Sequence, residues 1–130
     1  MTLPRHQLKL RVLSGRYTYA RLDAEAPIPA WAEDAEFSLQ LRTLGELAVI
    51  CPCENVPPNV RQEGPWKIIG IYATLDFNQV GIIASLAVPL AEAGLSIAPI
   101  ASFDTDYVLV READVDRAVD VLRAAGHRVG

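Results

Sequence analysis

The most regular pattern of apolar and polar residues lies in the second half of the chain. Trp66–Leu75 is rich in β-branched and aromatic residues and is too short and too interrupted by glycine for a helix, so it predicts a strand. Apolar residues then recur at helical spacing from Ile82 to Ala93, and Gly94 follows as a C-terminal stop. A strand is therefore followed by a helix.

A pair of strands is predicted next. Leu95–Ala101 alternates between apolar and polar positions and contains Pro99, which a sheet tolerates at an edge. The polar residues Ser102–Thr105 can close a turn on their own backbone, and Asp106–Val110 resumes the extended pattern. These two strands are expected to form a hairpin whose first strand is peripheral.

A second amphipathic helix is predicted from about Ala113 and ends at Gly126, which leaves His127–Val129 for a short last strand. The resulting order is β-α-β-β-α-β. Two right-handed crossovers around a central hairpin put both helices on one face of an antiparallel sheet. The sequence therefore predicts an α+β, ferredoxin-like fold for this half, in which the second strand lies at an edge.

The first half of the chain is strand-rich. Short strands are predicted by alternation or by apolar runs at Leu8–Leu13, Tyr17–Leu22, Phe37–Leu41 and Leu47–Cys51. The segment Ala24–Glu36 contains Pro27 and Pro29, which discourage a long helix. Any half-domain here should be irregular or abbreviated.

The segment Glu54–Pro65 (ENVPPNVRQEGP) carries the strongest linker signal, with three prolines and a glycine among polar residues. It predicts a division into residues 1–60 and 61–130. A half of about 60 residues buries only a marginal core by itself. The halves should therefore pack together, or the protein should form a dimer.

Composition narrows the class of protein. Hydrophobic residues make up 51% and charged residues 22%, the balance of a packed globular protein. No apolar run reaches the roughly 20 residues of a membrane-spanning helix, and the start has no secretory pattern, so a soluble, cytoplasmic protein is expected. The net charge of −4 and the absence of a long basic cluster argue against a nucleic-acid partner.

Few residues suggest catalysis or metal binding. Cys51 and Cys53 have no second pair of ligands to complete a zinc site, so reduced thiols are expected. His6 falls in a frayed start and His127 beside a helix end, where surface or capping roles are expected, and Ser85 lacks a nucleophile-elbow pattern. No phosphate-binding loop or dinucleotide fingerprint occurs. No catalytic residue, metal or cofactor is predicted.

The stretch Asp76–Ile83, between the first strand and the first helix, is the best candidate for a binding loop. Asn78 can cap the helix, Gly81 lets another group approach the backbone, and the helix N-terminus favours an anion such as an α-carboxylate. Asp104 or Asp106 of the hairpin can accept from an ammonium group. The alternative is that these residues only cap the helix and close turns.

The block SLAVPLAEAGLSI, continued by SFDTDYVLV, resembles the ACT-domain family, in the branch of bacterial tandem-ACT proteins, and is similar to the ACT repeats of a cytosolic arginine sensor. The resemblance covers Trp66–Val129, and CPCENVP in the first half looks like part of a degenerate partner unit. It implies a regulatory ligand site between ACT units. Val80 stands where many ACT loops have proline. The site residues implied are Asn78, Val80, Gly81 and Ile82 in the loop and Asp104, Thr105 and Asp106 in the hairpin.

The leading hypothesis is a non-catalytic regulatory protein, forming a homodimer, that binds a small effector, an amino acid. A second hypothesis is an assembly module that pairs through an edge strand and binds no ligand. A third is a small ferredoxin-like enzyme using Asp104 and Asp106, although alternation along a strand would send these two side chains to opposite faces.

Overall fold

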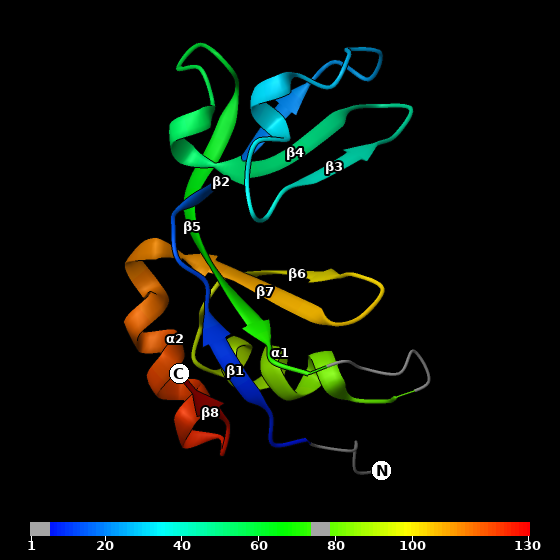
Figure 1. The fold of residues 1–130 in the computed structure, drawn as a ribbon. Helices are drawn as coiled ribbons and strands as arrows, with labels where there is room; N and C mark the ends of the chain where they lie inside the picture. Colours follow the sequence, from blue (N-terminus) through cyan, green and yellow to red (C-terminus); the bar gives the residue numbers. More distant parts are fainter. Residues whose placement is uncertain (1–5, 74–78) are drawn as a thin grey trace. The chain divides into compact units, whose positions relative to one another are not determined.

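The computed structural model describes residues 6–73 and 79–130. By contacts within the chain, the protein divides into an N-terminal unit, Gly15–Trp66, and a C-terminal unit, Met1–Ser14 with Lys67–Gly130. The strand β5 (Gln62–Ile71) crosses from the first unit into the second (Figure 1). This division differs from the expected boundary between residues 60 and 61, because the start of the chain folds with the C-terminal unit.

The C-terminal unit follows the predicted order of elements. Its elements in chain order are β1 (Lys9–Val12), the second part of β5, α1 (Ile82–Glu92), β6 (Ile97–Ala101), β7 (Asp106–Arg111), a 3-10 turn (Glu112–Asp114), α2 (Val115–Ala124) and β8 (Arg128–Val129). From β5 onward this is the expected βαββαβ sequence. Among the described strands β6 pairs with β7 alone, so Pro99 lies on an edge strand, as predicted.

The place of β1 differs from the expectation. This strand was assigned to the N-terminal domain, but it lies between β5 and β8, antiparallel to β5 and parallel to β8 (Figure 1). Leu10 is opposite Ile71 on one side and Val129 on the other. An alternating pattern predicts a strand without indicating which strand it pairs with.

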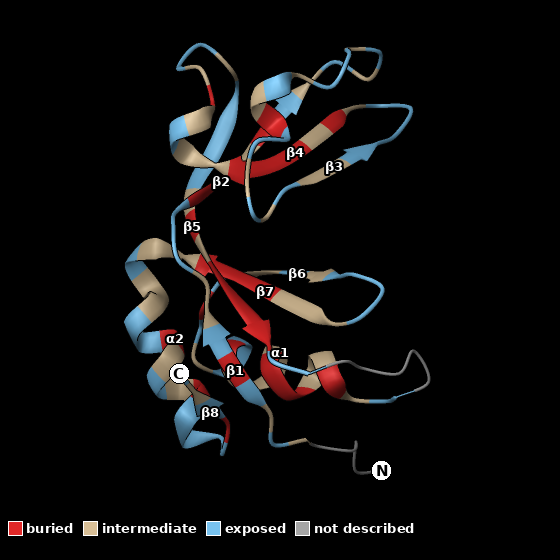
Figure 2. Ribbon diagram, viewed as in Figure 1, coloured by how far each residue is buried: buried red, intermediate tan, exposed pale blue. Residues whose placement is uncertain are grey.

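One apolar core joins the two helices to the sheet of this unit. Figure 2 shows buried residues along β5 and β7 and on α1. The buried cluster consists of Leu10, Ile69, Ile71, Val108 and Val110 from strands, Ile82, Leu86, Leu90, Ala118 and Leu122 from helices, and Leu95. Because one set of alternate strand residues meets both helices, the helices cover the same face of the sheet. The ferredoxin-like arrangement is confirmed.

The N-terminal unit is strand-rich, as predicted, and residues 15–66, all of them described, contain no α-helix. Its sheet order is β3-β4-β2-β5. Its elements before β5 are β2 (Tyr17–Leu22), a 3-10 turn (Ala30–Ala32), β3 (Leu39–Arg42), β4 (Leu47–Pro52) and a second 3-10 turn (Cys53–Asn55). The predicted linker is part of this fold, since Gln62 already pairs with Ala20 of β2. The linker was predicted from side-chain composition, whereas strand pairing uses main-chain groups, so a polar, proline-rich segment can still join a sheet.

Neither α1 nor α2, the α-helices among the described residues, is long and apolar enough to span a membrane.

Cys51 is fully buried in the core of the N-terminal unit. This burial, with smaller contributions from Cys53 and Glu54, raises the pKa of the Cys51 thiol to about 11. Because the thiolate is the reactive form, we expect Cys51 to resist iodoacetamide in folded protein at mildly alkaline pH and to react after denaturation. Mass spectrometry of digests can compare it with the partly exposed Cys53. Equal labelling of Cys51 in folded and denatured protein would contradict its burial.

Candidate functional site

The bend before α1 is built around Gly81. This residue has φ 86° and ψ 6°, a left-handed conformation that glycine adopts without the strain of a side chain. It is the N-terminal cap residue of α1, and no side chain caps the helix there. The first-turn N–H groups of a helix have no partner within the helix. Asn78, the predicted cap, lies outside the described residues, so its role stays a prediction.

The start of the described chain lies against this bend. His6 donates from its ring nitrogen Nε2 to the carbonyl oxygen of Val80 over 2.8 Å, and its main-chain N–H donates to the hydroxyl of Ser85 over 2.9 Å. The Ser85 hydroxyl in turn donates to the carbonyl oxygen of Gly81 over 2.7 Å. The expectation of a frayed start at His6 is therefore wrong, because main-chain and side-chain groups of His6 both bind residues of α1 and its bend.

His127 connects Leu8, directly before β1, to α1. Its ring nitrogen Nδ1 accepts from the N–H of Leu8 over 3.0 Å, and Nε2 lies 2.8 Å from the carbonyl oxygen of Ser85. Since Nδ1 is an acceptor, the ring is neutral and donates through Nε2. His127 is only 5% exposed. The ring therefore has a structural role in the interior and does not lie at the surface, whereas the expected capping role applies to the main chain, because the N–H of His127 donates to the carbonyl oxygen of Leu122 at the end of α2.

The hairpin between β6 and β7 holds the other predicted residues. The hydroxyl of Ser102 accepts from the N–H of Thr105 and donates to its carbonyl oxygen, which closes the turn. The Thr105 hydroxyl donates to the carbonyl oxygen of Ile71 over 3.2 Å, so the turn is attached to the end of β5. Asp104 is exposed, whereas Asp106 is half-buried, and burial raises its pKa.

The predicted residues thus fall into two groups. Val80, Gly81 and Ile82 form the start of α1, while Asp104, Thr105 and Asp106 lie in the hairpin that is bound to the end of β5. Within the part of the chain that the structure describes, no hydrogen bond joins one group to the other. The bond from Thr105 to Ile71 places the hairpin beside the end of β5. That the two groups form one site stays a prediction.

Two residues at this bend were not predicted as part of a site: His6 and Ser85. His6 and Ser85 are 79 residues apart in the sequence, and no local pattern signals such a pair.

The described residues contain no group of three or more histidine, cysteine, aspartate or glutamate side chains that could hold a metal ion. The two histidines are engaged in the hydrogen bonds given above, with Val80, Leu8 and Ser85.

Comparison with known proteins gives both a family and a fold. A family model described as an ACT domain matches residues 62–124, and a model described as an N-terminal domain matches residues 15–59. No curated protein matches. A solved protein of Agobacterium tumefaciens is 36% identical, with 96% of this chain and 93% of that chain covered and a TM-score of 0.90.

Two more distant structures share the fold. A Vibrio cholerae protein of unknown function, described as a possible transport protein, is 17% identical, with 92% of this chain and 91% of that one covered and a TM-score of 0.74. The aspartate kinase of Clostridium acetobutylicum is 11% identical, with 96% of this chain but 36% of the kinase covered and a TM-score of 0.66. With the βαββαβ order of its C-terminal unit, the match over residues 62–124 shows that this chain belongs to the ACT-domain family.

Proposed function

We propose that this protein is a non-catalytic, cytoplasmic regulatory protein that binds an amino acid at the start of α1. The observation that supports this most directly is the left-handed Gly81 followed by a helix without a side-chain cap. First-turn N–H groups and the positive end of the helix dipole favour a carboxylate, at about 0.3–1 kcal/mol for the dipole alone. The α-carboxylate of an amino acid is the group that we assign to this position.

The hairpin supplies the acceptor for the α-ammonium group in this proposal. Thr105 holds the turn at the end of β5, and Asp104 and Asp106 flank it. Burial raises the pKa of Asp106, because removing the carboxyl group from water disfavours its charged form. A cation nearby favours the ionised carboxylate. An ammonium group bound beside Asp106 would therefore stabilise the charged form of this side chain.

His6 is an additional residue of the proposed site. Its ring is bound to the carbonyl oxygen of Val80, directly before Gly81, so a ligand at this bend would lie beside the ring or replace it. Members of the ACT-domain family are typically regulatory, and the solved aspartate kinase with this fold is described as an allosteric enzyme. The proposal therefore assigns regulation rather than catalysis to this chain, acting as a homodimer.

The test is a thermal-shift screen of the twenty common amino acids. One site stabilises the folded state by RT ln(1 + [L]/Kd), about 2.7 kcal/mol at a hundredfold excess over Kd. We expect one amino acid, or one chemical group of them, to raise the melting temperature. Gly81→Asp should abolish this response because it places a carboxylate where the ligand carboxylate binds.

Gly94→Asp is the matched control. Gly94 lies at the other end of α1, also has a positive φ of 77°, and has no atom within 4 Å of an added Cβ. Both variants introduce the same charge and a comparable backbone strain, but only one changes the proposed site. A flat screen, or equal loss of response in both variants, would count against the proposal.

The assembly hypothesis has less support. The edge strand β6 contains Pro99, which removes an N–H donor from the row that a partner strand would need. Light scattering with and without the identified amino acid separates the two functions, since an assembly module forms the same oligomer in both conditions.

A further inference from the structure

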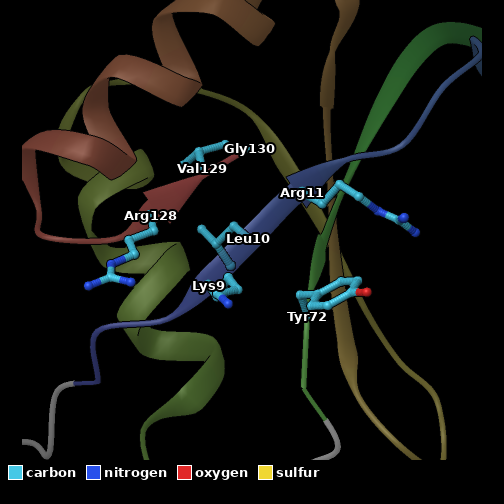
Figure 3. Close-up of a pocket in the computed structure, with 7 residues that line it drawn as sticks. All are labelled: Lys9, Leu10, Arg11, Tyr72, Arg128, Val129 and Gly130. Atoms are coloured by element: carbon cyan, nitrogen blue, oxygen red, sulfur yellow. The ribbon is translucent and has the colours of Figure 1, made fainter.

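A hollow of about 330 Å³ lies over β1 and β8 of the C-terminal unit, apart from the residues proposed to bind the amino acid. Figure 3 shows its lining, which consists of Lys9, Leu10, Arg11, Tyr72, Arg128, Val129 and Gly130. None of these residues has an acidic side chain, whereas three of them carry a positive charge. In a chain with a net charge of −4, this is a local excess of the opposite sign.

Strand geometry puts two of the cations on the same face. Leu10 points into the core beneath the helices, so its neighbours Lys9 and Arg11 point to the opposite face of the sheet, and both are exposed. Arg128 lies directly beside Lys9 in the parallel pairing of β1 with β8. Like charges on adjacent strands are destabilising. Within the described residues, no carboxylate side chain forms an ion pair with Lys9 or Arg128.

Arg11 is held at the rim by an aromatic ring. Its guanidinium carbon lies 5.5 Å from the centre of the exposed Tyr72 ring, within the range of a cation–π contact. Lys9 and Arg128 also line a neighbouring hollow of about 260 Å³, beside Gln7 and Gly126. These two cations therefore stand between two concave surfaces, where an anion can reach both.

We propose that this face binds a small polyanion, a molecule with two or more phosphate or carboxylate groups. Arginine binds such groups through two parallel hydrogen bonds, and lysine adds a mobile positive charge. A single exposed ion pair contributes little to binding, so several charges are needed for useful affinity. The volume is at the lower end of ligand pockets, about 300–1,000 Å³, which favours a small molecule. The site is independent of the amino-acid site.

The test is a titration of ¹⁵N-labelled protein with pyrophosphate and, separately, with citrate, at constant ionic strength maintained with chloride. We expect saturable amide shifts centred on Leu10, Arg11, Tyr72 and Val129. The double variant Arg11→Gln/Arg128→Gln should weaken binding by about tenfold, equivalent to about 1.4 kcal/mol. Arg61→Gln, an exposed arginine of the N-terminal unit, is the matched control and should bind as the wild type does.

Each outcome decides the proposal. Shifts with pyrophosphate alone identify phosphate groups, shifts with citrate alone identify carboxylates, and shifts with both show that charge number dominates; each supports the site. Absence of saturable shifts, shifts spread evenly over the protein, or unchanged binding by the double variant would overturn it. The wild-type titration depends on no variant, and a flat amino-acid screen would leave it unaffected.

Discussion

Replacement of His127 by phenylalanine should lower the free energy of unfolding by about 2–6 kcal/mol, because two main-chain groups lose their hydrogen-bond partner at about 1–3 kcal/mol each. These groups are the N–H of Leu8, which donates to Nδ1, and the carbonyl oxygen of Ser85, which accepts from Nε2. Phenylalanine keeps the ring but offers neither nitrogen.

The reason that Ser85 needs this partner lies four residues further along the helix. Its carbonyl oxygen would ordinarily accept from the N–H of residue 89, but that residue is Pro89, inside α1, and proline has no N–H. His127, from the far end of the sequence, donates in its place. The helix tolerates a proline here because a buried imidazole satisfies the free carbonyl oxygen.

A double-mutant cycle tests this link between His127 and Pro89. Pro89→Ala restores an N–H at the position where Ser85 can accept it, so in the phenylalanine background it should recover about 1–2 kcal/mol more than in the wild type. Chemical denaturation of the four proteins, followed by circular dichroism, gives the coupling energy. A coupling near zero would show that His127 does not compensate for the N–H that Pro89 lacks.

The C-terminal fold could be predicted because each of its elements has a local signal. The apolar spacing of α1 and α2 indicated both helices, and Gly94 and Gly126, with φ of 77° and 99°, mark the ends expected of them. Pro99 correctly indicated an edge strand. These features depend on neighbouring residues, which the sequence presents directly.

Long-range pairing had no such signal. The alternation over Leu8–Leu13 predicted β1 correctly, but its position between β5 and β8 depends on residues about 60 and 120 positions away. The polar residues Gln62–Pro65 suggested a linker, whereas main-chain pairing with β2 makes them part of a strand. Alternation and composition both describe side chains, whereas main-chain hydrogen bonds between distant residues determine which strands pair.

Near the candidate site, too, local features were predicted and long-range contacts were missed. The glycine that begins α1 followed from the loop sequence, and the turn at Ser102–Thr105 followed from its polar residues. His6 was predicted to lie in a frayed start and His127 beside a helix end with a surface or capping role, because nothing adjacent to them in the sequence indicated a partner for their rings. Both bind α1 or its bend across more than 40 residues of sequence, which only the folded chain reveals.

Gly64 is the position where a single methyl group should do the most damage to the N-terminal unit. A Cβ at this position would lie 2.7 Å from Oγ1, 3.0 Å from Cβ and 3.1 Å from Cα of Thr18. Thr18 is only 2% exposed, and its hydroxyl donates to the carbonyl oxygen of Glu63. The register between β2 and β5 shifts at this point, between Tyr17 and Tyr19.

The clash cannot be relieved by a side-chain rotation, because it includes the main-chain Cα of Thr18. β2 is held on its other side by pairing with β4 along its whole length, from Tyr17 to Leu22. Overpacking of this kind costs about 1–3 kcal/mol. Gly64→Ala should therefore reduce the free energy of unfolding by that amount, measured by urea denaturation.

Gly45→Ala provides the comparison. Gly45 lies in the turn between β3 and β4, and the nearest atom to an added Cβ is Oγ1 of Thr43 at 4.0 Å, so its free energy of unfolding should change by no more than about 0.5 kcal/mol. Thr18→Gly in the Gly64→Ala protein removes two of the three close atoms and should make the Gly64→Ala change less costly than it is beside Thr18. Equal costs of Gly64→Ala in the two backgrounds would show that the close approach of β2 and β5 is not what requires glycine there.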